Sequence, residues 1–174
     1  METIIVSIIC IALIVFGGMT MSQGFMTSVD ASTTGLEEIG ARDETIMRTE
    51  LTPVSTYLET PVGPDPLEIT LENTGQTRIA DFDKWDIIVQ YYDDSDAYHV
   101  EWLPYIQGTL DTYEWEVVSI EINGQPEIFE QGVLNPEEQI TLRTLLEPSV
   151  GAGTTNMVVV STPSGVTAST YFSP

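Results

Sequence analysis

The sequence predicts an α+β protein in which a long N-terminal hydrophobic α-helix is followed by an all-β, immunoglobulin-like antiparallel sandwich. Three observations support this fold class. Residues 3–29 are 27 uncharged and mostly apolar residues. From Thr49 onward apolar and polar side chains alternate, and turn-forming residues separate the alternating segments. We therefore divide the chain into an N-terminal helix with its extension, residues 1–48, and a β-sandwich head, residues 49–174.

The N-terminal run is long enough to cross a bilayer, because 27 residues extend about 40 Å as an α-helix. Apolar residues occupy every side of this helix, as is typical of a helix surrounded by lipid or by other helices. Basic residues, which usually set the orientation of a membrane helix, are missing from its flanks. Small residues at Gly17, Gly18, Ser22 and Gly24 would let neighbouring helices approach closely.

The run is not typical of a secretory signal, which begins with a basic segment and ends in a small-residue cleavage site. Two alternatives remain, an uncleaved membrane helix or a mature terminus from which a basic leader has been removed. The absence of Lys and Arg before Arg42 favours the second.

Residues 30–48 are predicted to form a frayed or broken helical extension. Leu36 and Ile39 keep a helical spacing, but Gly35 and Gly40 weaken it. The head then begins where the apolar pattern changes to a period of two.

Eight segments of the head have the alternation that is typical of strands. They cover residues 51–59, 67–73, 85–92, 98–106, 114–122, 139–146, 156–162 and 166–172. Turn residues lie between them, among them Pro61–Pro64 and the pair Asn123-Gly124, which predicts a tight hairpin turn. Short strands with no helical segment between them indicate an antiparallel sandwich or barrel.

The chain is strongly acidic, with 27 Asp and Glu against five Lys and Arg, a net charge of −22. Such a surface repels nucleic acid and anionic lipid headgroups, so no nucleic-acid partner is expected. The single cysteine, Cys10, lies in the apolar run, so one chain contains no disulfide and its stability must come from packing.

No enzyme activity, metal or cofactor is expected. His99 is the only histidine and no Gly-x-Ser-x-Gly turn is present, so a nucleophile–base pair is not indicated; His99 is predicted to face solvent on a strand. Zinc has no ligand set. The acidic turn Asp93–Asp96 could collect Ca²⁺ ligands, but it lacks the spacing of a calcium loop, and a solvated turn is favoured.

Aromatic residues are concentrated in the middle of the head. They could form a sugar- or partner-binding face or, as we favour, pack across strands within the fold. The residues concerned are Trp85, Tyr91, Tyr92, Tyr98, Trp102, Tyr105, Tyr113 and Trp115.

The layout resembles that of archaellins, the subunits of the archaeal swimming filament, and of pilins made with a class III leader peptide. The similarity is carried by the apolar helix from Ile4 to Met26 and by residues 67–94 and 132–146. In contrast to the Gly/Ala-rich start of many archaellins, this helix begins Met1-Glu2-Thr3 and is rich in isoleucine. An acidic residue close to the start, here Glu2, is also a feature of pilins.

This resemblance implies that a leader peptidase exposes the N-terminus, that the helix waits in the membrane, and that an assembly platform then transfers it into a homopolymer of many copies. The product would be an extracellular filament on the cell surface. Residues that would line the polymer core are Ile4, Ile5, Ile8, Ile9, Ile11, Leu13, Ile14, Val15, Phe16, Gly17, Gly18, Met19, Met21 and Phe25. The alternatives are an adhesive pilin and a membrane-anchored, stator-like accessory protein of the archaellum.

Overall fold

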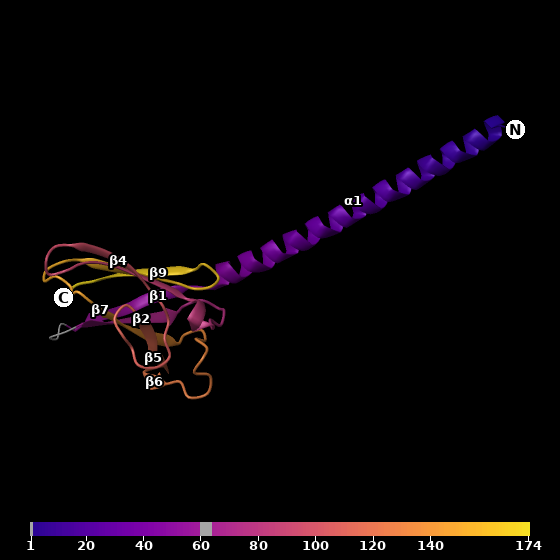
Figure 1. Cartoon of the computed structure of the whole chain (residues 1–174). Helices are drawn as coiled ribbons and strands as arrows, with labels where there is room; N and C mark the ends of the chain where they lie inside the picture. Colours follow the sequence, from indigo (N-terminus) through magenta and orange to yellow (C-terminus); the bar gives the residue numbers. More distant parts are fainter. Residues whose placement is uncertain (1, 60–63) are drawn as a thin grey trace. The chain divides into compact units, whose positions relative to one another are not determined.

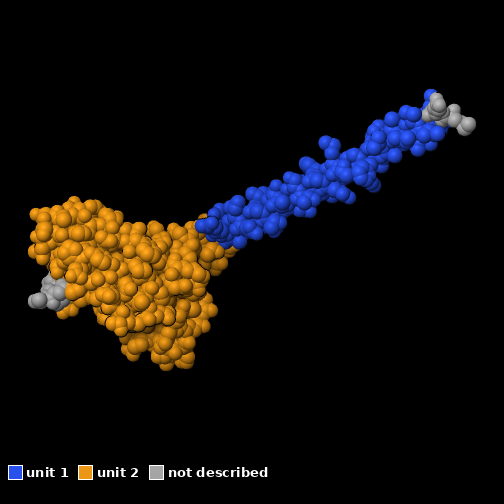
Figure 2. Space-filling view, viewed as in Figure 1, with its two compact units in different colours: residues 1–43 blue, residues 44–174 orange. Residues whose placement is uncertain are grey.

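The computed structural model describes residues 2–59 and 64–174, which form a long helix and two antiparallel β-sheets (Figure 1). The chain divides into two compact units, Met1–Asp43 and Glu44–Pro174, coloured separately in Figure 2. A long N-terminal helix followed by a β-sandwich was predicted, and this fold class is confirmed. Of the turn expected at Pro61–Pro64, residues 61–63 lie outside the described residues.

Helix α1 runs from Glu2 to Arg48 without interruption, so the predicted fraying over residues 30–48 is wrong. A glycine in a helix costs only about 1 kcal/mol relative to alanine, and neither Gly35 nor Gly40 breaks the hydrogen-bonded ladder. Hydroxyl groups in the extension also bond within the helix, as when the Thr33 and Thr34 hydroxyls donate to carbonyls four residues earlier, both at 3.0 Å.

The head contains nine strands among the described residues. The first sheet has the order β1-β2-β7-β5-β6 and the second has the order β4-β3-β8-β9, with antiparallel neighbours in both. The strands are β1 Leu51–Leu58, β2 Asp65–Asn73, β3 Asp86–Tyr92, β4 Tyr98–Leu103, β5 Trp115–Ile122, β6 Gln125–Pro126, β7 Gln139–Leu146, β8 Asn156–Ser161 and β9 Thr167–Phe172. A short 3₁₀ turn, η1, covers Phe82–Lys84.

All eight predicted strand segments contain a strand, and the predicted hairpin turn is present. Asn123 and Gly124 both have positive φ angles, 52° and 72°, and connect β5 to β6. Such a two-residue turn needs a left-handed backbone at both positions, which Asn and Gly adopt most readily. The two-residue strand β6 was not predicted, because two residues are too few to show an alternating pattern.

The core lies between the two sheets and follows the alternation of the strands. In β2 and β7 every second residue is buried, since successive side chains of a strand point to opposite faces. The largest fully buried side chains are Trp85, Tyr91 and Trp115. They come from the segment between η1 and β3, from β3 itself and from β5, so the core joins both sheets.

Candidate functional site: the apolar surface of the N-terminal helix

Every large apolar side chain predicted to line a polymer core is exposed within the single chain. Their exposed fractions run from 52% at Ile9 to 81% at Met21. The set is Ile4, Ile5, Ile8, Ile9, Ile11, Leu13, Ile14, Val15, Phe16, Met19, Met21 and Phe25. An apolar surface of this size on a soluble monomer indicates an interaction with lipid or with other protein.

The glycines of the helix create a shallow region between the bulky side chains. A Cβ placed at Gly17, Gly18 or Gly24 would meet no atom within 4 Å, so these positions are not required for packing within one chain. Small residues at such positions let a second helix approach closely. The role predicted for Gly17 and Gly18 therefore needs an additional helix.

Length and composition would allow α1 to cross a membrane, with a mean hydropathy of 2.7 in its most apolar window. After Glu2 the next charged residue is Asp30, and the last turn carries an Arg48–Glu44 ion pair at 3.3 Å. A cation in the last turn also interacts favourably with the helix dipole. The helix thus has an uncharged N-terminal part and a polar C-terminal part.

The last turn of α1 belongs to the same unit as the head, and the loop after β2 binds it. The Gln76 amide donates to the Arg48 carbonyl at 2.7 Å, and the Gly75 amide donates to the Glu50 carbonyl at 3.2 Å. A Cβ at Gly75 would lie only 2.5 Å from the Glu50 nitrogen. Glycine is therefore needed where this loop crosses the junction of α1 and β1.

His99 does not face solvent as predicted, because it packs on β3 and binds an acidic residue. Its ring stacks on Tyr91, with centroids 5.0 Å apart, and its Nε2 lies 2.9 Å from Oδ2 of Asp93. In the structure His99 lies on the inward side of the edge strand β4, and the sequence could not show that Asp93 reaches the same position. Burial raises the pKa of the Tyr91 phenol well above its ordinary value.

The acidic turn is organised around the carboxylate of Asp93. Oδ1 of Asp93 accepts the amides of Ser95 and Ala97 at 2.7 and 2.9 Å, and Oδ2 accepts from His99. These donors, with His99 first, hold the pKa of the Asp93 carboxyl below its usual range. Within residues 2–59 and 64–174, no three His, Cys, Asp or Glu side chains are grouped so that they could hold a metal ion.

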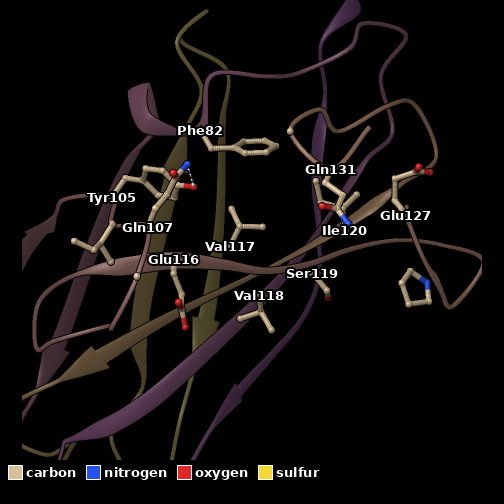
Figure 3. A pocket seen from close by; sticks show the side chains of 14 residues that line it. Phe82, Tyr105, Gln107, Glu116, Val117, Val118, Ser119, Ile120, Glu127 and Gln131 are labelled. Carbon is tan, nitrogen blue, oxygen red and sulfur yellow. Dashed lines mark hydrogen bonds between the residues drawn. The ribbon is translucent and has the colours of Figure 1, made fainter. Parts of the chain in front are cut away.

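A hollow of about 520 Å³ lies beside β5 (Figure 3). Its lining is mixed, with Phe82, Tyr105 and Val117 beside the carboxylates of Glu116 and Glu127. Both carboxylates already have partners. Glu116 lies 3.7 Å from Arg143, and Glu127 accepts the Phe129 amide at 2.5 Å. The lining contains no histidine or cysteine.

The aromatic residues divide into two groups. Trp85, Trp115 and Tyr91 are buried in the core, as the preferred prediction of strand packing requires. Trp102 and Tyr98 on β4 are instead more than half exposed. Tyr98 still packs across strands, with its ring centroid 5.0 Å from that of Tyr92 on β3. A signal for this exposed group is present in the sequence. Tyr98, Val100 and Trp102 are alternate residues, so they lie on one face of a strand, and none of them is charged in a strongly acidic chain.

No protein-family model and no curated protein matches the sequence. Among solved structures, the archaeal flagellum of Methanospirillum hungatei strain JF1 resembles it with 13% identity and a TM-score of 0.61, covering 96% of this chain and 90% of that chain. The archaellum periplasmic stator protein FlaG from Sulfolobus acidocaldarius, alone and in complex with FlaF, has 17% identity and a TM-score of 0.49. That match covers 71% of this chain and 99% and 89% of those chains.

The match to the M. hungatei flagellum shows that the two chains share a fold over almost their whole lengths. The resemblance to archaellins is thus confirmed at the level of the fold, a long apolar helix with a β-sandwich head. The similarity to FlaG is too low for an argument about this chain.

Proposed function

We propose that this chain is a structural subunit of an extracellular helical filament of the archaellum type, and that it polymerises through α1. The observation that supports this most strongly is the uncharged, exposed apolar surface of residues 4–25. A fold shared with a flagellar filament over 96% of the chain supports it independently. The chain is proposed to act without catalysis, metal or cofactor.

The energetics of the helix fit a subunit that passes from membrane to polymer. Twelve exposed large apolar side chains, at about 1.5–3 kcal/mol each on burial, make the free helix strongly unfavourable in water. Lipid removes this penalty, so a precursor can wait in the membrane until a leader peptidase and an assembly platform act on it. Transfer into a helix bundle then depends on close packing at small residues, since hydrocarbon is as apolar as the bundle.

A membrane-anchored surface protein is the second candidate, because α1 is also long and apolar enough to remain in a bilayer. Such a protein would use the β-sandwich to bind a partner as a single copy. An adhesive pilin would share the polymer proposed here and would differ only in what the filament does.

Electron microscopy of material sheared from the producing cells tests the proposal, combined with mass spectrometry of the sheared protein. Long helical filaments composed of this chain are expected, and cells from which its gene has been deleted should lack them. A protein that stays in the membrane fraction as single copies would overturn the filament proposal in favour of the anchored protein. A swimming assay on the deletion strain then separates motility from adhesion.

A further inference from the structure

The head has an outward-facing apolar surface on its second sheet, which we call the aromatic face. Residues 87, 89 and 91 of β3 are buried, so Ile88, Gln90 and Tyr92 point away from the core. The strand register then places Trp102, Val100 and Tyr98 of β4 beside them, and Tyr171 of β9 next to Met157 of β8. The exposed members are Tyr92, Tyr98, Val100, Trp102 and Tyr171, between 43% and 68% exposed.

Two polar groups of the aromatic face have partners within the face. The Trp102 indole donates to Asp86 at 2.9 Å and the Tyr98 hydroxyl donates to Gln90 at 2.9 Å. Asp86 keeps its negative charge beside Trp102. The other residues named on this face are uncharged, although the head from Thr49 onward carries 21 acidic and three basic residues.

A second exposed apolar feature lies in the loop between β6 and β7. Phe129 is 88% exposed and Ile128 is 69% exposed, and we call this pair the loop tip. The loop after β6 lies on the opposite side of the head from β4 and β9 (Figure 1). The aromatic face and the loop tip are thus separate surfaces of one head.

The acidic residues on either side of the loop tip are used to hold it in place. Glu127 accepts the amides of Phe129 and Glu130 at 2.5 and 3.2 Å, and Glu130 forms an ion pair with Arg78. The base of the loop is fixed by paired backbone hydrogen bonds between Ile79 and Leu134, at 3.0 and 2.7 Å. This anchoring presents two apolar side chains to solvent beside carboxylates that already have partners.

We infer that the loop tip of one copy of this chain packs on the aromatic face of the next copy. The proposed filament places copies of this chain beside one another, so we take a second copy as the occupant. Two heads with this excess of carboxylates repel least where the residues that meet are uncharged, as are both residues of the loop tip and most residues of the aromatic face. Because the two surfaces differ, the contact is head-to-tail and can repeat from one copy to the next along a helical polymer.

The available area is small, so the contact should form within the polymer and not between free heads. Four partly exposed aromatic residues offer roughly 400 Å², given about 150–250 Å² for each when fully buried. A stable pair of proteins usually needs about 800 Å² from each partner. The inference rests on the proposed filament, in which packing of α1 supplies the high local concentration that such a weak contact requires.

Cysteine cross-linking in intact cells tests the contact, in the full-length chain with Cys10→Ser as background so that no other thiol is present. A chain carrying both Val100→Cys and Phe129→Cys should form a ladder of disulfide-linked dimers, trimers and longer products under mild oxidation. The two variants expressed together as separate single-cysteine chains should stop at dimers. Each single variant expressed alone should remain monomeric.

The control pairs Phe129→Cys with Ala152→Cys, an exposed residue outside both surfaces, and should give no ladder. Dimers from Val100→Cys alone would show that the aromatic face pairs with itself. Cross-links to another protein would show that a different protein covers this face. Either result overturns the inference. Filaments that form without the Val100–Phe129 ladder refute the contact and leave the filament intact. A ladder in cells without filaments would refute the filament and would also overturn the inference that the contact depends on it.

Discussion

Ile11 lies near the centre of the uncharged run and is 61% exposed on α1. Replacing it with aspartate places a charge among side chains that must be buried in lipid or in a helix bundle. The cost in a membrane helix is about 2.5–3.5 kcal/mol at the centre, or roughly a hundredfold in an assembly equilibrium. We predict that Ile11→Asp abolishes filaments, as counted by electron microscopy of sheared material.

Thr33→Asp is the matched control, because it adds the same charge on an exposed position of the polar part of α1. Filaments should form in this variant at wild-type length. The membrane fraction of both variants should be assayed, so that failed insertion is distinguished from failed assembly. Filaments of normal length from Ile11→Asp would show that residues 4–25 do not line the core.

Asp93 makes the stability of the folded head depend on pH in the acidic range. Its folded-state pKa is lowered by His99 and by the Ala97 amide, relative to about 3.9 for an unperturbed aspartate. A carboxyl with a lowered folded-state pKa stabilises the fold above its unfolded pKa, and this contribution is lost as the pH falls through the folded pKa. Asp93→Asn should therefore be less stable than wild type at pH 7, and the difference should shrink below about pH 4.

Thermal unfolding followed by tryptophan fluorescence measures this difference, because all three tryptophans lie in the head. Asp94→Asn, at the exposed neighbouring position, is the control. Its difference from wild type should be small and should change little with pH. Equal pH dependence in the two variants would mean that Asp93 has no special role.

At the scale of elements, the junction of α1 and β1 depends on the loop after β2. Gly75 approaches the backbone of Arg48 and Glu50 so closely that a Cβ would lie 2.6 Å from the Arg48 oxygen and 2.5 Å from the Glu50 nitrogen. Because backbone atoms cannot move aside as a flexible side chain can, Gly75→Ala should cost about 1–3 kcal/mol of head stability.

Denaturant unfolding of Gly75→Ala and Gly132→Ala makes the comparison. A Cβ at Gly132 meets no atom within 4 Å, so that substitution should leave the unfolding midpoint almost unchanged. Two variants of equal stability would contradict the close approach at the junction.

The strands and the N-terminal helix could be predicted because they depend on patterns that are local in the sequence. Alternation identifies β2 and β7, and the uncharged run identifies the start of α1. The behaviour of residues 30–48 could not be read in this way, since glycine content alone does not show that hydroxyls bond back into the helix. The Asp93–His99 pair was also missed, because turn geometry brings Asp93 back over the inward side of β4.

The sequence predicts residues 4–25 as the surface for polymerisation, and the structure shows their large apolar side chains exposed. Their place in a polymer core stays a prediction, because a single chain does not show which partner covers them. The loop tip depends on how Glu127 and Arg78 hold a loop whose base pairs with the segment before η1. That arrangement brings together residues about fifty positions apart, which no local pattern reveals.

For the whole molecule, apolar helices attract one another while acidic heads repel. The head from Thr49 onward has 21 acidic and three basic residues, and a domain of its size has a radius of gyration of about 14 Å. The separation between charges on adjacent heads is therefore shorter than the screening length of about 30 Å in 0.01 M salt. It is mostly longer than the screening length of about 8 Å in 0.15 M salt. Filaments should thus be least stable at low ionic strength.

Light scattering of purified filaments during heating measures this effect across a series of salt concentrations. We predict that the disassembly temperature rises with salt and also as the pH falls towards the pKa of ordinary carboxyls. Salt also strengthens apolar association, so a variant must separate the two causes. Asp83→Asn, Asp94→Asn and Glu147→Gln together remove three charges at exposed positions and should flatten the salt dependence. If the triple variant keeps the wild-type salt dependence, the effect of salt on the disassembly temperature comes from the helices. Repulsion between heads would then not determine the stability of the filament.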